Sequence, residues 1–343
     1  MILFRSTYQV FFLSVVLCAM IVSFSFTGKP IHKCNEDAAT WGFFGHKKIN
    51  ELAVYTLPEE MFGFYKQNMD YLIEHSVDPD KRRYGVKGEA ECHYIDMDHY
   101  ITKDQPNPFE NVPRRWTDAV AKFSEDSLRE HGIVPWNVFS VTTKLTSAFK
   151  NEDVARILRY SAELGHYLGD AHVPLHTTSN YNGQQTGQRG IHGFWESRLP
   201  ELYSEDYDFF VGKSQYIKSP LNYIWDRVEE SFAAVDSVLG FERDLNSMYS
   251  EDQKYSYETR GQVNMKVYSA AYSQAYSNML DGQVERRMRT AVISVGSYWY
   301  TAWVDAGQPD LSKFLDQKVM AVPDSLDPAN SDPKATFKAR EHE

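Results

Sequence analysis

Two pairs of a histidine and a carboxylate stand four residues apart in the middle of the chain: His166 with Asp170, and His192 with Glu196. On a helix this spacing places both side chains of a pair on one face, with Cβ atoms about 5–6 Å apart. A further histidine, His176, lies between the two pairs. Zinc binds imidazole nitrogen and carboxylate oxygen at about 2 Å, in sets of three or four ligands. These residues therefore predict a centre that holds more than one metal ion.

One pair taken alone also fits a less specific interpretation, in which His166 and Asp170 form a hydrogen-bonded pair that closes a helix. Both residues interrupt an apolar stripe in residues 152–170. A buried carboxylate needs a cation or several hydrogen-bond donors. His176 and the second pair therefore favour the metal centre. Further residues of the same chemical types lie upstream, and they are His46, Asp78 and His93.

The elements that must position these residues are predicted to be helices. Apolar residues recur at helical spacing, and few stretches alternate with the period of a strand. The pattern predicts an all-α fold with long helices packed around a polar centre. Helices are expected from Trp41, at 59–75, and at 113–131, 136–150, 152–170, 190–203, 218–239, 258–280 and 282–304. Gly132 and Gly240 are expected to end helices, whereas residues 76–111 are expected to be rich in loops.

The composition is that of a folded protein with a sizeable core. The 343 residues are 42% hydrophobic and 14% aromatic, which excludes a disordered chain and permits one large domain or two smaller ones. The net charge of −11 provides no global basic field for binding nucleic acid, although bound metal ions would add positive charge locally. The segment 308–343 is rich in Pro, Asp and Lys and is expected to be a flexible tail.

The first 26 residues have the pattern of an export signal. An apolar stretch from Val10 to Phe26 follows Arg5 and is short for a membrane span of about 20 residues. We expect a signal peptide over 1–26 and a periplasmic or secreted protein, with an uncleaved N-terminal anchor as the alternative. Residues 27–40 are polar and are interpreted as a linker or propeptide. Pairing of Cys34 with Cys92 stays open, because sequence alone does not pair cysteines.

The motifs occur in a definite order: Trp-x4-His from Trp41, an aspartate, His-Tyr-Ile-Asp from His93, His-Tyr-Leu-Gly-Asp-x5-His from His166, and His-x3-Glu from His192. This order resembles the superfamily of zinc-dependent phospholipases C and single-strand-specific zinc nucleases, from about Trp41 to Asp305. The motif that starts at His166 is its most specific part. The resemblance implies a multi-helix all-α domain over 41–307, with three zinc ions in a central cleft.

Carried over by position, the resemblance implies three ligand sets. One zinc would be bound by Asp78, His93, His166 and Asp170; a second by His46, Asp170 and the backbone of Trp41; and a third, open to water and substrate, by His176, His192 and Glu196. Asp80 is a rival for Asp78, and Asp78 is preferred because Ser-Val-Asp resembles the family's approach to its ligand. In the family the tryptophan is the mature N-terminus and its amine binds zinc. Here Trp41 lies beyond the apolar segment, so a second cleavage is expected to free it; the alternative is a second zinc that is weaker or absent.

The chemistry that follows from such a site is phosphodiester hydrolysis. Zinc lowers the pKa of bound water to about 7, and we expect in-line attack by zinc-bound hydroxide. Asp78 is the predicted catalytic residue that orients or deprotonates the water. The predicted substrate contacts are Lys81, Asp96 and Tyr181. The alternatives are a solvated loop for the basic run 81–83 and a turn cap for Asp96.

The substrate class is the most open part of the prediction. Glu196 as the last ligand, and only sixteen positions from His176 to His192, resemble the phospholipase C branch, so phospholipid is preferred. The stretch 183–190 is expected to be a flexible lip, and Phe194 and Trp195 are expected to pack in the core. The alternatives are a single-strand-specific endonuclease that cleaves DNA or RNA to 5′-phosphates, and a non-catalytic zinc-binding surface protein. Peripheral membrane contact fits the phospholipase function, and no stable protein partner is implied.

Overall fold

The chain divides into two units, Met1–Ala39 and Thr40–Glu343. The computed structural model describes residues 41–260 and 263–315, all within the second unit. The predicted signal peptide, the linker 27–40, Cys34 and the tail beyond residue 315 lie outside the described residues, so these predictions stay untested. Within the described part of the chain, no helix is both long enough and apolar enough to cross a membrane.

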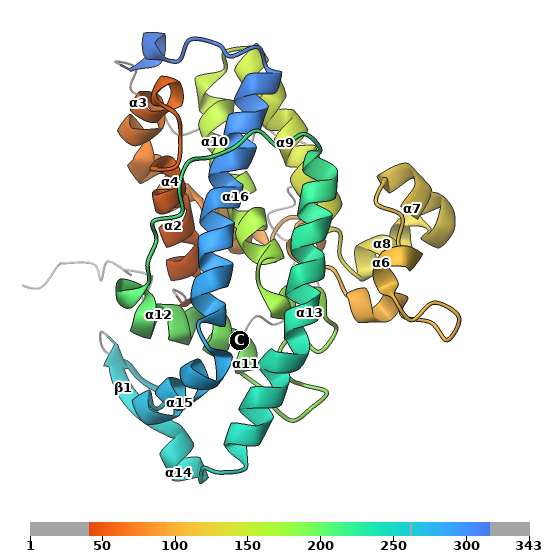
Figure 1. Ribbon diagram of the computed structural model, residues 1–343, viewed down its shortest axis with the longest axis vertical. Coiled ribbons are helices and arrows are strands. Elements are labelled where there is room, and N and C mark those ends of the chain that lie inside the picture. Colours follow the sequence, from red (N-terminus) through yellow and green to blue (C-terminus); the bar gives the residue numbers. More distant parts are fainter. Residues whose placement is uncertain (1–40, 261–262, 316–343) are drawn as a thin grey trace, which may run out of the picture. The chain divides into compact units, whose positions relative to one another are not determined.

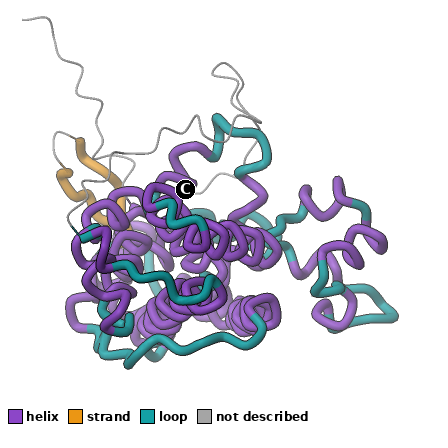
Figure 2. The backbone as a smooth tube through the Cα atoms, turned by 90° about the horizontal axis from the view of Figure 1, so that it is seen from above, coloured by secondary structure: helices purple, strands orange, loops and turns teal. Residues whose placement is uncertain are grey.

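Five long helices run side by side and form the body of the domain (Figure 1). They are α2 (Trp41–Val54), α9 (Val134–Lys150), α10 (Val154–Ala171), α13 (Pro220–Asn246) and α16 (Gln283–Asp305). Helix α10 contacts each of the other four, and every residue from Ser161 to Ala171 is buried. Seen from above, the helices are gathered around one another and the two strands lie at one side (Figure 2). The all-α class predicted from the sequence is confirmed, with one hairpin as an addition.

Helix α10 forms where its local signals place it. Its N-cap Asp153 accepts a hydrogen bond from the backbone nitrogen of Arg156 at 3.1 Å, which satisfies one of the unpaired donors of the first turn. The helix ends before Pro174, which cannot continue it. A glycine within a helix costs about 1 kcal/mol relative to alanine. Gly169 nevertheless suits its position, because a Cβ there would lie only 2.9 Å from Nδ1 of His46 on α2.

Short elements connect and flank the long helices. They are α3 (Glu59–Gln67), α4 (Met69–His75), α5 (Asp78–Arg82), η2 (Ala90–His93), η3 (Met97–Tyr100), α6 (Pro108–Asn111), α7 (Trp116–Phe123), α8 (Glu125–Glu130), η4 (Pro174–Thr177), α11 (Ile191–Gly193), η5 (Phe194–Arg198), α12 (Leu199–Tyr203), η6 (Ser204–Asp206), α14 (Glu251–Lys254), β1 (Tyr255–Arg260), β2 (Val263–Tyr268), α15 (Ala270–Leu280) and η7 (Ser312–Phe314). Helices α6, α7 and α8 lie together to one side of the long helices, and the hairpin lies near α12 and α15 (Figure 1).

The helix expected at 258–280 is wrong over its first half. Strands β1 and β2 pair antiparallel there, from Tyr255 opposite Tyr268 to Arg260 opposite Val263. Aromatic and β-branched residues suit a pleated surface, and the ring of Tyr268 stacks on Phe194 with centroids 3.8 Å apart. This packing between segments far apart in the sequence outweighs the helical pattern. The second half of the expected helix is α15.

The helix boundaries show further differences, and the helix expected at 59–75 is broken into α3 and α4 at Asn68. The helix expected at 113–131 is broken into α7 and α8 at Ser124, whose side chain accepts a hydrogen bond from the first turn of α8. Gly132 ends α8 as expected and has a φ of +88°, whereas Gly240 does not end α13, which continues to Asn246. After α16, Leu311 and Phe314 are buried and η7 contacts α3, so the described start of the predicted tail packs on the domain.

Candidate metal centre

Five histidines and three carboxylates from seven separate elements converge beside α10. Four overlapping groups of three have ligand atoms within 4.8 Å of one another. The residues are His46 (α2), Asp80 (α5), His93 (η2), His166 and Asp170 (α10), His176 (η4), His192 (α11) and Glu196 (η5). The eight positions span 151 residues of the chain, so only the folded helices bring them together.

The first group consists of His93, His166 and Asp170, which are all buried. The Nδ1 atom of His93 lies 2.9 Å from Oδ2 of Asp170 and 3.0 Å from Nε2 of His166. The Oδ1 atom of Asp80 lies 3.7 Å from those same two nitrogens of His93 and His166. Four ligand atoms of the types that zinc prefers therefore face one point.

The second group consists of His176, His192 and Glu196. The Nε2 atoms of the two histidines are 3.1 Å apart. The Oε2 atom of Glu196 lies 2.7 Å from Nε2 of His192 and 3.4 Å from Nε2 of His176. Glu196 lies in the π-helical turn η5, a wider turn that occurs often at functional sites.

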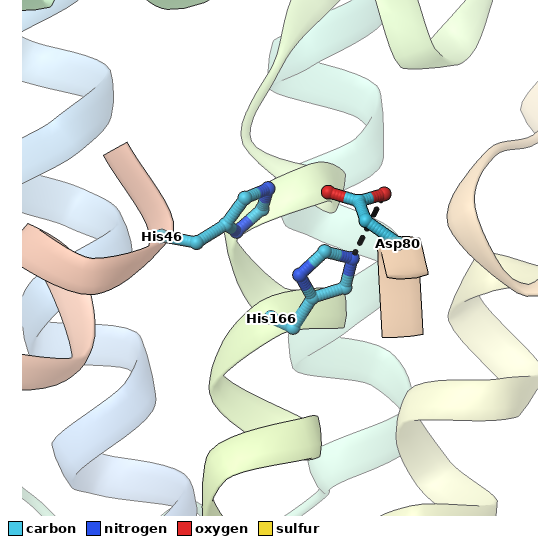
Figure 3. A group of neighbouring side chains, drawn as sticks. All are labelled: His46, Asp80 and His166. Atoms are coloured by element: carbon cyan, nitrogen blue, oxygen red, sulfur yellow. Dashed lines mark ion pairs between the residues drawn. The ribbon is translucent and has the colours of Figure 1, made fainter. Parts of the chain in front are cut away.

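His46 joins the two groups. Its Nε2 lies 3.4 Å from Oδ1 of Asp170 and 3.6 Å from Oε1 of Glu196. Its ring stacks on His166 with centroids 4.0 Å apart. Figure 3 shows His46 and Asp80 approaching His166 from two other elements, with the Asp80–His166 ion pair dashed. Oδ2 of Asp170 faces the first group and Oδ1 faces His46. This carboxylate therefore bridges the first group and His46.

The outer nitrogens of two histidines fix which nitrogen faces the centre. Nδ1 of His166 donates to the carbonyl of Ser76 at 2.8 Å, and Nδ1 of His176 donates to the carbonyl of His93 at 2.6 Å. A neutral imidazole that donates through Nδ1 carries its lone pair on Nε2. Both Nε2 atoms are therefore available as ligands.

The charges in the centre also suit a cation. Burial would raise the pKa of Asp170 and of Glu196, but the surrounding histidines hold both pKa values well below the usual range. Burial lowers the pKa of His166 to about 3, so that imidazole is neutral. Burial also disfavours charge on His46, yet Asp170 and Glu196 raise its pKa to about 10. The negative charge that holds a proton on His46 attracts a metal ion in the same way.

The distances themselves fit a tetrahedral ion. Two ligand atoms each bound to zinc at 2.0–2.1 Å with a tetrahedral angle are roughly 3.3 Å apart. The nitrogen–nitrogen and nitrogen–oxygen distances within the two groups, with Asp80 added to the first, run from 2.7 to 3.7 Å. Imidazole together with carboxylate is a donor set that suits zinc. The residues present therefore fit the predicted metal.

This geometry favours Asp80, the rival, over the preferred Asp78 as a ligand. Oδ2 of Asp78 lies 2.5 Å from Nδ1 of His75, and its Oδ1 accepts a hydrogen bond from Lys81 at 3.0 Å. Both aspartates lie in the short helix α5, where residues two apart do not share a face. Because the helix turns Asp80 toward His93 and His166, Asp78 faces other partners.

We expect Asp80→Asn to lower the affinity of the protein for zinc by about tenfold or more, because an amide is a poor substitute for an anionic ligand. Asp78→Asn is the matched control, since it makes the same change two residues away in the same helix. Competition titration against a coloured chelator measures both affinities. A larger loss in the Asp78 variant than in the Asp80 variant would contradict this assignment.

The three predicted substrate contacts have different neighbours in the structure. Lys81 is paired with Asp78. The buried carboxylate of Asp96 lies 3.7 Å from Nδ1 of His131. The half-buried ring of Tyr181 lies beside the second group, with its centroid 6.4 Å from that of His192. The structure thus brings Tyr181 next to His192, one of the eight converging residues.

A buried arginine that was not among the predicted site residues lies beside Asp80. Arg83 is 2% exposed, and its Nη1 is 3.6 Å from Oδ1 of Asp80. Burial lowers the pKa of His192, and the positive charge of Arg83 adds to that effect. The Nε of Arg83 has no hydrogen-bond partner among the described atoms. Its place in the basic run 81–83 was the one sign of a role in the site, but sequence spacing did not distinguish Arg83 from Lys81 and Arg82.

The segment between His176 and His192 is held by side-chain hydrogen bonds. The side chain of Gln188 donates to Glu242 of α13 at 2.6 Å, and Asn182 accepts from the backbone of Gly190 at 2.9 Å. These bonds do not fit the expected flexible lip. Phe194 and Trp195 are buried, which confirms that they pack in the core.

Residues 41–292, more than two thirds of the chain, match the family model described as S1/P1 nuclease. No curated protein matches the chain significantly. Among solved structures, the chain is similar to the Clostridium perfringens alpha-toxin from an avian strain, with 14% sequence identity and a TM-score of 0.43. That likeness covers 79% of this chain and 65% of the toxin chain, so the chain spans less than two thirds of the toxin's length.

Proposed function

The chain belongs to the S1/P1 nuclease family, and from that membership we propose that it is a zinc-dependent phosphodiester hydrolase. The observation that carries the proposal is the convergence of two histidine–carboxylate groups on the shared residues Asp170, His46 and Glu196. A single structural zinc site has no need for such shared ligands, because it is closed by four ligands of its own.

We assign three zinc ions to the centre. Their ligands would be Asp80, His93, His166 and Asp170 for the first; His46, Asp170 and the backbone of Trp41 for the second; and His176, His192 and Glu196 for the third. When bound, zinc lowers the pKa of water to about 7 and neutralises charge on phosphate oxygens. The third set has only three protein ligands, which is the number that leaves a position open in catalytic sites.

The side chains around these ligands supply binding and orientation. The guanidinium of Arg83 is a donor without a full set of acceptors, and its Nη1 lies 3.6 Å from Oδ1 of Asp80. A phosphate oxygen is the acceptor that a guanidinium prefers. Arg83 would therefore hold the phosphate beside the ions, and Tyr181 would contact the group attached to it.

Arg83→Ala is expected to lower kcat/KM by about tenfold or more, because a charge-assisted hydrogen bond contributes about 1.5–3 kcal/mol. Lys81→Ala, two residues earlier, should leave kcat/KM within about twofold, since Lys81 is half exposed and pairs with Asp78. Steady-state kinetics give both values, and metal analysis of each variant confirms that the ions are retained. Equal losses in the two variants would contradict the role of Arg83.

Single-stranded nucleic acid is the proposed substrate. The match to the S1/P1 nuclease family spans every ligand position from His46 to Glu196. Nucleic-acid bases stack on aromatic rings, and the ring of Tyr181 beside His192 is placed for such a contact. The acidic protein does not need a global basic field, because the ions and Arg83 provide local positive charge.

Phospholipid is the second candidate substrate, and it was preferred from the sequence. Glu196 in place of an aspartate, and the short spacing from His176 to His192, favour it. The expected export of the protein is compatible with both substrates. The non-catalytic zinc-binding protein is disfavoured by the open third ligand set.

Assays of the purified protein on single-stranded DNA and on phosphatidylcholine vesicles, with and without a chelator, separate these functions. We expect hydrolysis of the DNA, loss of hydrolysis with the chelator, and recovery on adding zinc. Hydrolysis of phosphatidylcholine alone would select the phospholipase C function instead. A zinc-loaded protein that hydrolyses neither substrate would overturn the proposal.

A further inference from the structure

The two ring nitrogens of His93 face different surroundings. Its Nδ1 faces Asp170 and His166 in the first group. Its Nε2 points away from the group, and the nearest carboxylate oxygen is Oε1 of Glu89 at 3.6 Å. This Nε2 is buried and has no hydrogen-bond partner among the described atoms. A buried polar atom without a partner is rare enough to require an explanation.

Glu89 is itself held in place by other side chains. Its carboxylate accepts a hydrogen bond from Nε of Arg82 at 2.7 Å and another from the hydroxyl of Tyr167. The same guanidinium donates to Glu163 at 2.8 Å. Glu89 is 8% exposed and is the N-cap of η2, four residues before His93. The contacts fix a buried carboxylate beside the outer edge of the histidine.

The charge of this carboxylate is secured by its neighbours. The Arg82 guanidinium forms an ion pair with this carboxylate at 2.7 Å, which stabilises its negative charge. An anion therefore faces Nε2 of His93. A lone pair on Nε2 would be repelled by that anion, whereas an N–H would be attracted. The surroundings thus favour the tautomer of His93 that carries its proton on Nε2 and its lone pair on Nδ1.

We propose that Glu89 is a positioning residue that accepts the Nε2 proton of His93 and thereby sets the metal affinity of the first group. The inference rests on the proposed function, since it assigns Nδ1 of His93 as a zinc ligand. A ligand histidine usually donates its other N–H to a carboxylate, and loss of that partner lowers metal affinity by about 10–100-fold. A shift of a few tenths of an ångström would bring the 3.6 Å separation to hydrogen-bond length.

The test is Glu89→Gln, which keeps the size of the side chain and an oxygen for Arg82 but removes the negative charge. Zinc affinity is measured by competition with a coloured chelator. We expect the affinity of one zinc to fall by about tenfold or more, while the zinc of the second group keeps its affinity. Glu91→Gln is the matched control, because Glu91 lies in the same short helix and pairs with Arg129 instead. A Glu89→Gln variant with unchanged affinity for all its zinc would overturn the inference.

A second measurement separates positioning from a general loss of structure. In protein labelled with ¹⁵N-histidine, zinc-loaded wild type should show a protonated Nε2 on His93, and the exchange of that proton should quicken in Glu89→Gln. Should Glu89→Gln fail to fold, Tyr167→Phe removes one donor to Glu89 and should weaken the same zinc severalfold; unchanged affinity there would overturn the inference. Wild-type protein that binds no zinc would instead overturn the proposed function, so the two failures are distinguishable.

Discussion

Replacing Asp170 with Asn is expected to lower kcat by about a thousandfold. Asp170 is 1% exposed and is the carboxylate that faces both His46 and the His93–His166 pair. The change removes one negative charge that two ions would share, and a catalytic metal supplies several kcal/mol of transition-state stabilisation. A loss of about 4 kcal/mol corresponds to three factors of ten in rate. Kinetics with the substrate that the wild type hydrolyses measure the effect.

Asp153→Asn is the matched control for this variant. Asp153 is the N-cap of the same helix, and its side chain accepts from the backbone of Arg156. Asparagine is also a good N-cap, so stability and kcat should both change little. An Asp170→Asn variant that keeps its fold and at least a tenth of the wild-type kcat would show that Asp170 does not bridge catalytic ions.

Gly165→Ala is expected to lower the free energy of unfolding by about 2 kcal/mol. A Cβ at this position would lie 2.2 Å from Oδ1 of Asn50, whose side chain is fully buried and donates to the carbonyl of His46. Overpacking costs about 1–3 kcal/mol, and so close an approach belongs at the upper end; subtracting the gain of about 1 kcal/mol from the better helix former leaves about 2 kcal/mol. Because α2 must move away from α10, His46 would also shift and zinc affinity would fall.

The control for Gly165→Ala is Gly45→Ala in α2. A Cβ at Gly45 would make only an ordinary contact, 3.8 Å from the carbonyl of Glu196. This variant should be as stable as the wild type or more stable by up to about 1 kcal/mol. Chemical denaturation of both variants measures the difference. Gly165→Ala with wild-type stability would mean that the glycine does not set the distance between α2 and α10.

The parts of the fold that local signals determine were predictable from the sequence. Helix α10 follows from its apolar period, its N-cap Asp153 and the proline after it. The four-residue spacing of His166 and Asp170 then places both on one face whatever the rest of the chain does. The second group was predictable for the same reason, since His192 and Glu196 are four apart on consecutive helical turns.

The hairpin was not predictable in this way, because its segment contains good helix formers such as Glu258 and Lys266. What decides its conformation is pairing between the two strands and the stacking of Tyr268 on Phe194, which lies 74 residues earlier. The choice between Asp78 and Asp80 depends in turn on how a five-residue helix is rotated, and His75 and Lys81 contribute to that rotation by binding Asp78.

The residues that support the ligands were missed because their partners are distant in the sequence. Arg82 was interpreted only as part of the basic run 81–83, which would either contact phosphate or form a solvated loop, yet it binds Glu89 and also Glu163, which is 81 residues away. Glu89 carries no motif of its own. Its role becomes visible only in the folded protein, where Nε2 of His93 faces its carboxylate.

The most direct test of the account is the zinc content of the native protein, measured by elemental analysis after extensive dialysis against metal-free buffer. The account predicts at least two tightly bound zinc ions per chain, three when the backbone of Trp41 contributes, and a loss of zinc in Asp170→Asn. A correctly folded, hydrolytically active protein that retains no zinc and takes up none when zinc is added would contradict it.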